Sequence, residues 1–233
     1  IATTAAAAVA RSTGAAAVVA IGGGSALDLG KAVAAIAGAG EPAEAYALCA
    51  RDFPARRLGI VCVPTTAGTG AELTRTAVLS RADRSKTWLW GEALKADDVV
   101  LDPALCLALP AGLTAATGID ALVHAVEAAT NRNASAANNL AAHEAIRLVA
   151  ANLARAVADG ADLAAREGMQ RAAALAGIAI DNAGTAIAHN VGHALASLRP
   201  VHHGRAVGLA MLATAEWNAQ GDDGRWAACA EAL

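Results

Sequence analysis

Six histidines, all in the second half of the chain, are the residues best suited to chemistry. Asp120 and His124 stand four residues apart, which on a helix places a carboxylate and an imidazole about 6 Å apart on one face. His189 and His193 repeat this spacing further along the chain. Side chains at this separation suit two ligands of one metal ion. The pattern therefore predicts that separate helices deliver metal ligands to one point.

A third segment adds His202 and His203, and spacing alone does not decide between these neighbours. One carboxylate and three neutral imidazoles suit Fe(II) or Zn(II) and leave a coordination position for a substrate oxygen. A single buried histidine is more often a core residue than a metal ligand, but the clustering of several histidines favours a metal site. Glu127, one turn after His124, is open to two interpretations: a group that orients an imidazole, or, more ordinarily, a solvated helix residue.

Two loops rich in glycine and hydroxyl groups are candidates for nucleotide binding. Residues 22–25 (Gly-Gly-Gly-Ser) lie between an apolar strand and a helix, with Ser25 at the expected N-cap, so backbone amides there suit a phosphate. The motif is not G-x-G-x-x-G, so it does not support an ordinary Rossmann domain. The second loop, residues 64–72, also follows an apolar strand. Since loops after parallel strands gather at one sheet edge, we expect the two loops to meet and bracket a diphosphate or nicotinamide ribose.

The apolar runs predict an α/β first half and an all-helical second half. We expect strands at residues 16–21, 58–63, 77–79 and 99–101, and helices at residues 3–14 and 26–37. Beyond Pro110 the predicted elements are helices, at residues 114–129, 136–158, 161–180, 185–198 and 204–219. We therefore predict an α/β domain with an open, mostly parallel sheet in residues 1–109, an all-α domain in residues 110–233, and a ligand cleft between them.

Composition narrows the class of partner. The 233 residues are 56% hydrophobic and 17% charged with a net charge of −3, which favours a buried core and argues against nucleic acid or an anionic membrane as a partner. No apolar run reaches the ~18 residues of a membrane span. Four separated cysteines without a C-x-x-C pair indicate buried thiols in a reducing compartment. We expect a cytoplasmic protein with a small-molecule partner.

Several ordered motifs together resemble the iron-containing (group III) alcohol dehydrogenase family and the related glycerol dehydrogenases. They are residues 20–25 with Asp28 and Lys31, residues 64–72, Asp102-Pro103, residues 114–127, and residues 188–193 leading to His203-Gly204. The resemblance implies the architecture shared by dehydroquinate synthases and iron alcohol dehydrogenases. It also implies hydride transfer between NAD or NADP and an alcohol, aldehyde or ketone, with Fe(II) or Zn(II) polarising the substrate oxygen.

The resemblance also implies roles for individual residues. Asp120, His124, His189 and His203 fall on the family's metal-ligand positions, and His203 is preferred to His202 because the family's ligand directly precedes a glycine. His193 matches an active-site histidine near the nicotinamide and is the candidate catalytic residue, as a proton relay. The positions that match cofactor contacts are Gly22, Gly23, Gly24, Ser25, Asp28, Thr65, Thr66, Thr69, Thr74, Lys86 and Leu113.

Both ends of the chain depart from the family pattern. The family's first strand, which carries the residue that favours NAD or NADP, precedes residue 1, and the family's helical domain continues past Leu233. We therefore expect a fragment of a longer protein, with the choice between NAD and NADP left open. Because the family often forms dimers or larger assemblies, we also expect a homo-oligomer.

Other functions compete with this interpretation. The complete ligand set disfavours a metal-independent relative such as a maleylacetate reductase. The Thr-Ala-Gly-Thr-Gly-Ala-Glu loop resembles the alcohol dehydrogenases more than a cyclising synthase of the dehydroquinate synthase type. A truncated subunit would bind the cofactor without turnover. A helical scaffold or di-metal bundle is the alternative outside the enzyme class, and such bundles usually need two Glu-x-x-His repeats, which this sequence lacks.

Overall fold

The computed structural model describes residues 2–39, 41–55, 58–81 and 85–233. The chain divides into two compact units. The first comprises Ile1–Thr65 and Ala71–Leu101, and the second comprises Thr66–Gly70 and Asp102–Leu233. Among the described residues, none of the helices combines the length and the hydropathy needed to cross a bilayer.

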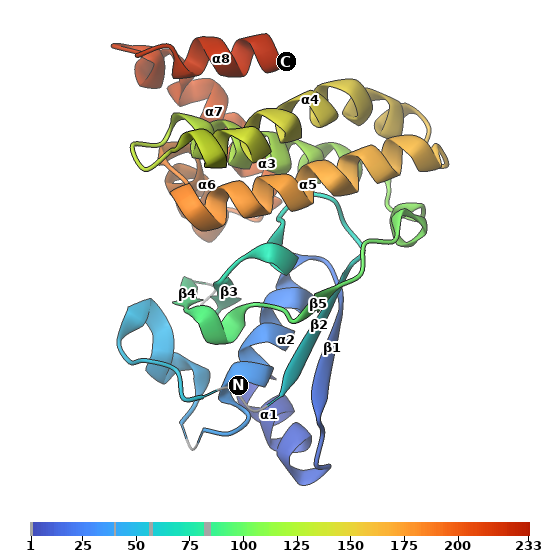
Figure 1. Ribbon diagram of the computed structural model, residues 1–233, viewed down its shortest axis with the longest axis vertical. Helices are drawn as coiled ribbons and strands as arrows, with labels where there is room; N and C mark the ends of the chain where they lie inside the picture. The colour runs from blue at the N-terminus through green and yellow to red at the C-terminus, as the bar shows by residue number, and fades with distance from the viewer. Residues whose placement is uncertain (1, 40, 56–57, 82–84) are drawn as a thin grey trace. The chain divides into compact units, whose positions relative to one another are not determined.

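The first unit contains a three-stranded parallel sheet (Figure 1). Its order is β1 (Ala17–Gly22), β2 (Gly59–Pro64) and β5 (Asp98–Val99). β1 and β2 pair in register from Ala17 opposite Gly59 to Gly22 opposite Pro64, so their carboxyl ends lie at the same edge. Helix α2 (Gly24–Ile36) packs on these strands and shares a core with them.

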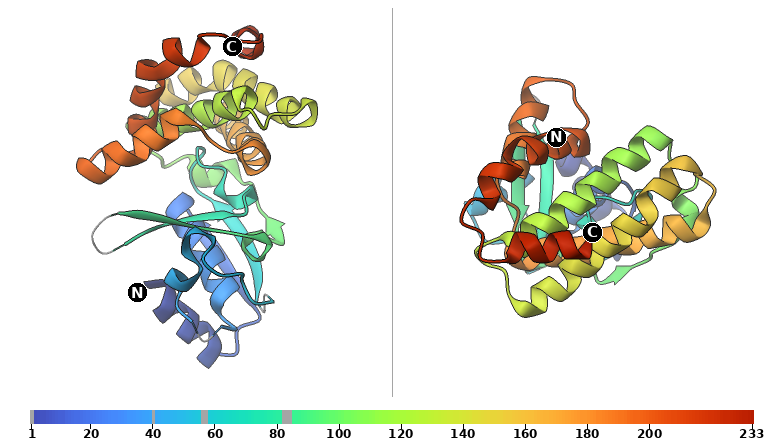
Figure 2. Two further views of the ribbon diagram at one scale, coloured as in Figure 1. Left: turned by 90° about the vertical axis from the view of Figure 1, so that its left-hand side faces the viewer. Right: turned by 90° about the horizontal axis from the view of Figure 1, so that it is seen from above.

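A separate two-stranded sheet completes the strands of the first unit. β3 (Thr76–Ser80) and β4 (Lys86–Trp90) pair antiparallel, and Figure 2 shows them as a long ribbon. The strand predicted at residues 77–79 is therefore present but lies outside the parallel sheet. Alternate residues of β4 are buried, as a strand with one covered face requires. The remaining elements of this unit are α1 (Ala2–Ser12), η1 (Ala43–Cys49), η2 (Ala71–Leu73) and η3 (Glu92–Leu94).

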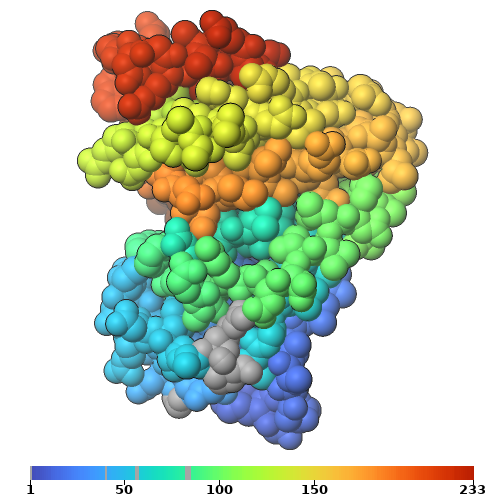
Figure 3. All heavy atoms as spheres, viewed as in Figure 1, coloured from blue at the N-terminus to red at the C-terminus, as the bar shows by residue number. Residues whose placement is uncertain are grey.

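The second unit consists of helices among its described residues. They are η4 (Pro103–Cys106), α3 (Ala111–Thr130), α4 (Ala136–Ala158), α5 (Leu163–Ala183), α6 (Ile187–Leu198), α7 (His203–Ala219) and α8 (Arg225–Ala232). α3, α4 and α5 pack together around cores rich in alanine, and Figure 3 shows the atoms of α4 and α5 in contact. The predicted fold class, a parallel α/β segment followed by an all-α segment, is confirmed.

Helix starts show how local sequence sets these boundaries. Ser135 accepts a hydrogen bond from the amide of Asn138 at the start of α4, and Asp162 does the same for Ala165 in α5. Ser25, predicted as an N-cap, instead lies inside α2. Gly23 is the N-cap, because its carbonyl oxygen already accepts the first helical hydrogen bond from Leu27 at 3.1 Å.

A buried lysine joins α2 to the segment that follows the second loop. Lys31 is 0% exposed, and its Nζ donates to Oδ1 of Asp28 at 3.3 Å and to the carbonyl oxygen of Ala71 at 2.6 Å. Oδ2 of Asp28 accepts from the amide of Val78 at 2.9 Å. Burial raises the pKa of Asp28 above its usual value, and the Lys31 ammonium and the Val78 amide offset only part of this shift. Lys31 and Asp28 together therefore tie α2 to η2 and β3.

We expect Lys31→Met to lower the free energy of unfolding of the first unit by about 3 kcal/mol, because it leaves a buried carboxylate without its cation. Chemical denaturation followed by circular dichroism measures this loss. Lys95→Met removes a half-exposed cation that pairs with Glu92, and serves as the control with little expected effect. Equal losses in the two variants would contradict a stabilising role for the buried cluster.

In the second unit, α3 and α7 come closest at Gly204. A Cβ atom at this position would collide with the carbonyl oxygen of Ala116 and lie 3.1 Å from Cβ of Asp120. Glycine is therefore required for the first turn of α7 to rest against α3. This close approach brings His203, the first residue of α7, to the turn of α3 that carries Asp120.

We expect Gly204→Ala to destabilise the second unit by about 1–3 kcal/mol, because the added methyl group forces α7 away from α3. Thermal unfolding monitored by calorimetry measures the change. Gly112→Ala is the matched control, since a Cβ on this helical glycine meets no atom within 4 Å. The control should leave stability unchanged or raise it slightly. If Gly204→Ala behaves like Gly112→Ala, the close packing has no energetic consequence.

Candidate metal centre

Side chains from α3, α6 and α7 converge on one point of the second unit. Nε2 of His189 and Nε2 of His203 each lie 3.6 Å from Oδ1 of Asp120. The ligand atoms of these three residues all lie within 4.8 Å of one another. Asp120 and His189 are each 2% exposed, whereas His203 is partly open. The structure thus brings together three of the four residues predicted as metal ligands. Of these three, His203 is partly accessible to solvent.

His124, the fourth predicted ligand, lies against the same cluster. Its ring stacks on the ring of His189 with centroids 4.2 Å apart, but it is not part of the converging group of three. Nδ1 of His124, Oδ1 of Asp120 and Nε2 of His189 are buried without a hydrogen-bond partner in the described structure. Buried polar atoms are rarely left unpaired, and a metal ion bound between them would satisfy this set. The donor types fit Fe(II) or Zn(II).

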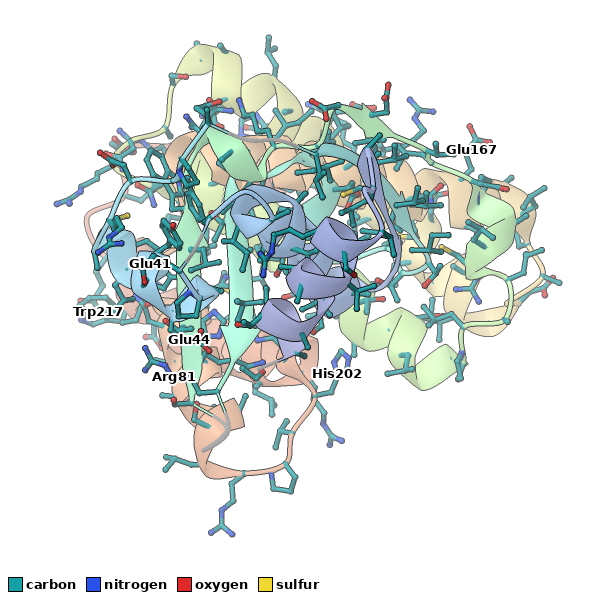
Figure 4. All side chains as sticks on the ribbon, turned by 90° about the horizontal axis from the view of Figure 1, so that it is seen from below. Glu41, Glu44, Arg81, Glu167, His202 and Trp217 are labelled. Atoms are coloured by element: carbon teal, nitrogen blue, oxygen red, sulfur yellow. The ribbon has the colours of Figure 1, made fainter. Side chains whose placement is uncertain are left out.

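Two further histidines lie near the cluster: His193 stacks on one of its members, and His202 is exposed at the surface. The ring of His193 stacks on that of His203 with centroids 4.7 Å apart, and its centroid lies 6.4 Å from that of His189. The predicted catalytic histidine therefore borders the cluster. His202 is exposed (Figure 4), so His203 is the member of the pair that reaches Asp120.

The charges of the cluster follow from burial and proximity. Burial alone would raise the pKa of Asp120, but the three imidazoles around it hold that pKa well below its usual value. Burial, assisted by the charge of His189, lowers the pKa of His124 to about 3. Burial also opposes protonation of His189, yet the carboxylates of Asp120 and Glu127 raise its pKa to about 9. In the metal-free protein, Asp120 is thus an anion and His124 a neutral imidazole.

The structure contradicts the more ordinary sequence interpretation of Glu127. It is 2% exposed, and its Oε2 lies 2.6 Å from Nδ1 of His189. It is therefore no solvated helix residue. Asp120, His124 and Glu127 are spaced by four and then three residues, which places all three on one face of α3. That shared face is the sequence signal that favours the alternative of a group orienting an imidazole.

The first predicted nucleotide loop touches the start of the second within the first unit, whereas residues 66–70 of the second loop belong to the second unit. The amide of Thr65 donates to the carbonyl oxygen of Gly22 at 2.9 Å, at the carboxyl edge of the parallel sheet. Ser25 is exposed and borders a hollow of this unit. Glu44 and Arg81, labelled in Figure 4, line the same hollow. Open space therefore adjoins the first turn of α2 at Ser25.

The other predicted cofactor residues are distributed over both units. Asp28, Thr74 and Lys86 belong to the first unit, and Thr66, Thr69 and Leu113 belong to the second. Asp28 and Thr74 are buried and both bind Lys31. Lys86 is exposed, and its Nζ donates to Oγ of Ser80 at 2.7 Å. A cofactor contact at each of these positions stays a prediction.

Known proteins resemble this chain over most of its length. Long-chain-alcohol dehydrogenase 1 of Geobacillus thermodenitrificans is 41% identical over 191 residues, which is 81% of this chain and 48% of that protein. The 1,3-propanediol dehydrogenase of Klebsiella pneumoniae is 38% identical over 218 residues, or 93% of this chain and 56% of that protein. The chain spans about half the length of these curated relatives.

A solved structure gives the same result in three dimensions. The sulfoacetaldehyde reductase of Bifidobacterium kashiwanohense, in complex with NAD+, matches with a TM-score of 0.89 at 32% identity, over 93% of this chain and 58% of that one. The family model described as iron-containing alcohol dehydrogenase matches residues 2–103. The model described as Fe-containing alcohol dehydrogenase family, C-terminal, matches residues 114–233. The chain therefore belongs to the iron-containing alcohol dehydrogenase family.

Proposed function

We propose that this protein is a metal-dependent oxidoreductase that transfers a hydride between NAD(H) or NADP(H) and an alcohol, aldehyde or ketone. The convergence of Asp120, His189 and His203 carries the proposal in a chain of this family, because Oδ1 of Asp120 and Nε2 of His189 are buried without a hydrogen-bond partner among the described residues. The NAD+ complex of the Bifidobacterium reductase supports a nicotinamide cofactor. A bound Fe(II) or Zn(II) supplies Lewis acidity at the substrate oxygen.

We assign the roles by the two domains that the sequence predicts. Residues 1–109 hold the nucleotide, with the glycine turn before α2 presenting backbone amides and a helix N-terminus to the pyrophosphate. Residues 110–233 hold the metal through Asp120, His124, His189 and His203, together with the substrate. The stacking of His193 on His203 supports a role for His193 in moving the alcohol proton. The same proposal includes a cytoplasmic location and a homo-oligomeric assembly.

A metal-independent relative is the second candidate within the enzyme class. Nothing in that chemistry needs a buried carboxylate that faces two imidazole nitrogens at 3.6 Å. Replacing this cluster by apolar side chains would remove the cost of burying it. The retained cluster therefore favours the metal-dependent reaction.

Metal removal tests the proposal directly. Protein purified without a chelator should contain about one iron or zinc per chain by elemental mass spectrometry, as expected for a specific site. It should oxidise NADH or NADPH with short aldehydes. A chelator should abolish turnover, and Fe(II) or Zn(II) should restore it. Asp120→Ala should lose both metal and turnover, because it removes the anionic ligand. Turnover that survives chelation would instead support the metal-independent candidate.

His193→Ala separates proton transfer from metal binding. We expect kcat to fall by about 10²-fold, the usual contribution of a positioned acid or base, while metal content stays near one per chain. His202→Ala is the control, because His202 is an exposed neighbour of His203, and its turnover should match that of the wild type. Loss of metal from His193→Ala would show that His193 is a ligand and not a proton relay.

A further inference from the structure

The carboxylate of Glu127 links the metal cluster to the start of a helix. Besides the contact of Oε2 with Nδ1 of His189, Oε2 accepts from the amide of Ala186 at 2.7 Å, and Oε1 accepts from the amide of Ala188 at 2.7 Å. Ala186 is the N-cap of α6 and supplies no side-chain cap of its own. Glu127, on α3, therefore satisfies amides that a helix start otherwise leaves unpaired.

The same contacts determine which nitrogen of His189 can bind a metal. Two backbone amides, which can only donate, point at the two carboxyl oxygens of Glu127, and this is the environment of a carboxylate anion. An ionised carboxylate only accepts hydrogen bonds, so Nδ1 of His189 must be the donor. In a neutral ring this leaves the lone pair on Nε2, the nitrogen 3.6 Å from Asp120.

Glu127 positions the backbone at the start of α6 and the imidazole ring of His189 together, because His189 is the third residue of α6. One rigid group on α3 fixes both the first amides of α6 and the orientation of the imidazole that follows them. A ligand histidine commonly donates its second nitrogen to such an outer partner, and loss of that partner weakens metal binding.

We propose that Glu127 is a positioning residue that fixes the orientation and tautomer of His189 and thereby sets the metal affinity of the cluster. The inference rests on the proposed metal site and does not depend on hydride transfer. It differs from a purely structural capping role, because a cap would stabilise α6 without affecting the protonation of the ring.

Glutamine at position 127 distinguishes these roles. Its shape matches that of glutamate, but one of its two terminal atoms is an NH2 group that donates. In the wild type, three N–H donors face the two carboxylate oxygens of Glu127. In Glu127→Gln, at least one of these N–H groups would face the NH2 group, which is itself a donor. We expect the affinity for Zn(II), measured by competition with a chromophoric chelator, to fall about 10- to 100-fold. Glu127→Asp, which keeps the charge, should recover part of this loss.

Asp162→Asn is the matched control, because Asp162 is also a carboxylate that caps a helix of the second unit, accepting from Ala165 at 3.0 Å. It should change thermal stability but leave the Zn(II) affinity within twofold of the wild type. A Glu127→Gln affinity within twofold of the wild type, or an equal loss in Asp162→Asn, would overturn the proposal.

A measurement on the wild-type protein needs no variant. In the zinc-loaded form, imidazole nitrogen correlations by NMR should show His189 protonated at Nδ1 and metal-bound at Nε2. Protonation at Nε2 would overturn the inference. Wild-type protein that binds Zn(II) tightly but reduces no aldehyde would count against the proposed function alone, since the readouts here are affinity and tautomer.

Discussion

The buried carboxylate of Asp120 is the constraint on which the second unit depends. An anion on α3 with 2% exposure is costly unless positive or polar groups compensate it. The imidazoles of His189 and His203 provide that compensation, but they lie on α6 and α7 and reach Asp120 only if both helices pack closely. Gly204 makes this possible for α7, because its missing side chain leaves room for the backbone of Ala116.

The first unit solves a related problem with a cation. A lysine with 0% exposure is unfavourable alone, yet Lys31 finds a carboxylate and backbone carbonyl oxygens within hydrogen-bond distance. Its position in α2 links the helix that begins at the glycine turn to β3, two segments far apart in the sequence. The turn that we propose to hold pyrophosphate thus begins a helix that this buried network fixes to β3.

Helices with a strong apolar periodicity were predictable from the sequence. Strand pairing was not, because it depends on contacts with other segments of the fold, and neither was the start of α2. Helix α4 spans Ala136–Ala158, the range that its apolar spacing predicts. The strand around Ala77 was predicted, but its antiparallel pairing with β4 depends on the opposing Leu89, which packs with it in one core. The predicted cap, Ser25, lies two residues after the actual N-cap Gly23, because the carbonyl oxygen of Gly23 already accepts the first helical hydrogen bond.

By itself, the sequence determined the fold class, the family and the set of residues able to bind a metal, because periodicity, motif order and residue type are local properties of the chain. The tertiary structure decided which of those residues meet. It placed His203, the residue that the family resemblance prefers to His202, beside Asp120, stacked His124 on His189 and buried Glu127 against α6. The physical reason is that convergence depends on how closely α3, α6 and α7 pack, and that distance is set by small residues and hydrogen bonds between segments far apart in the chain.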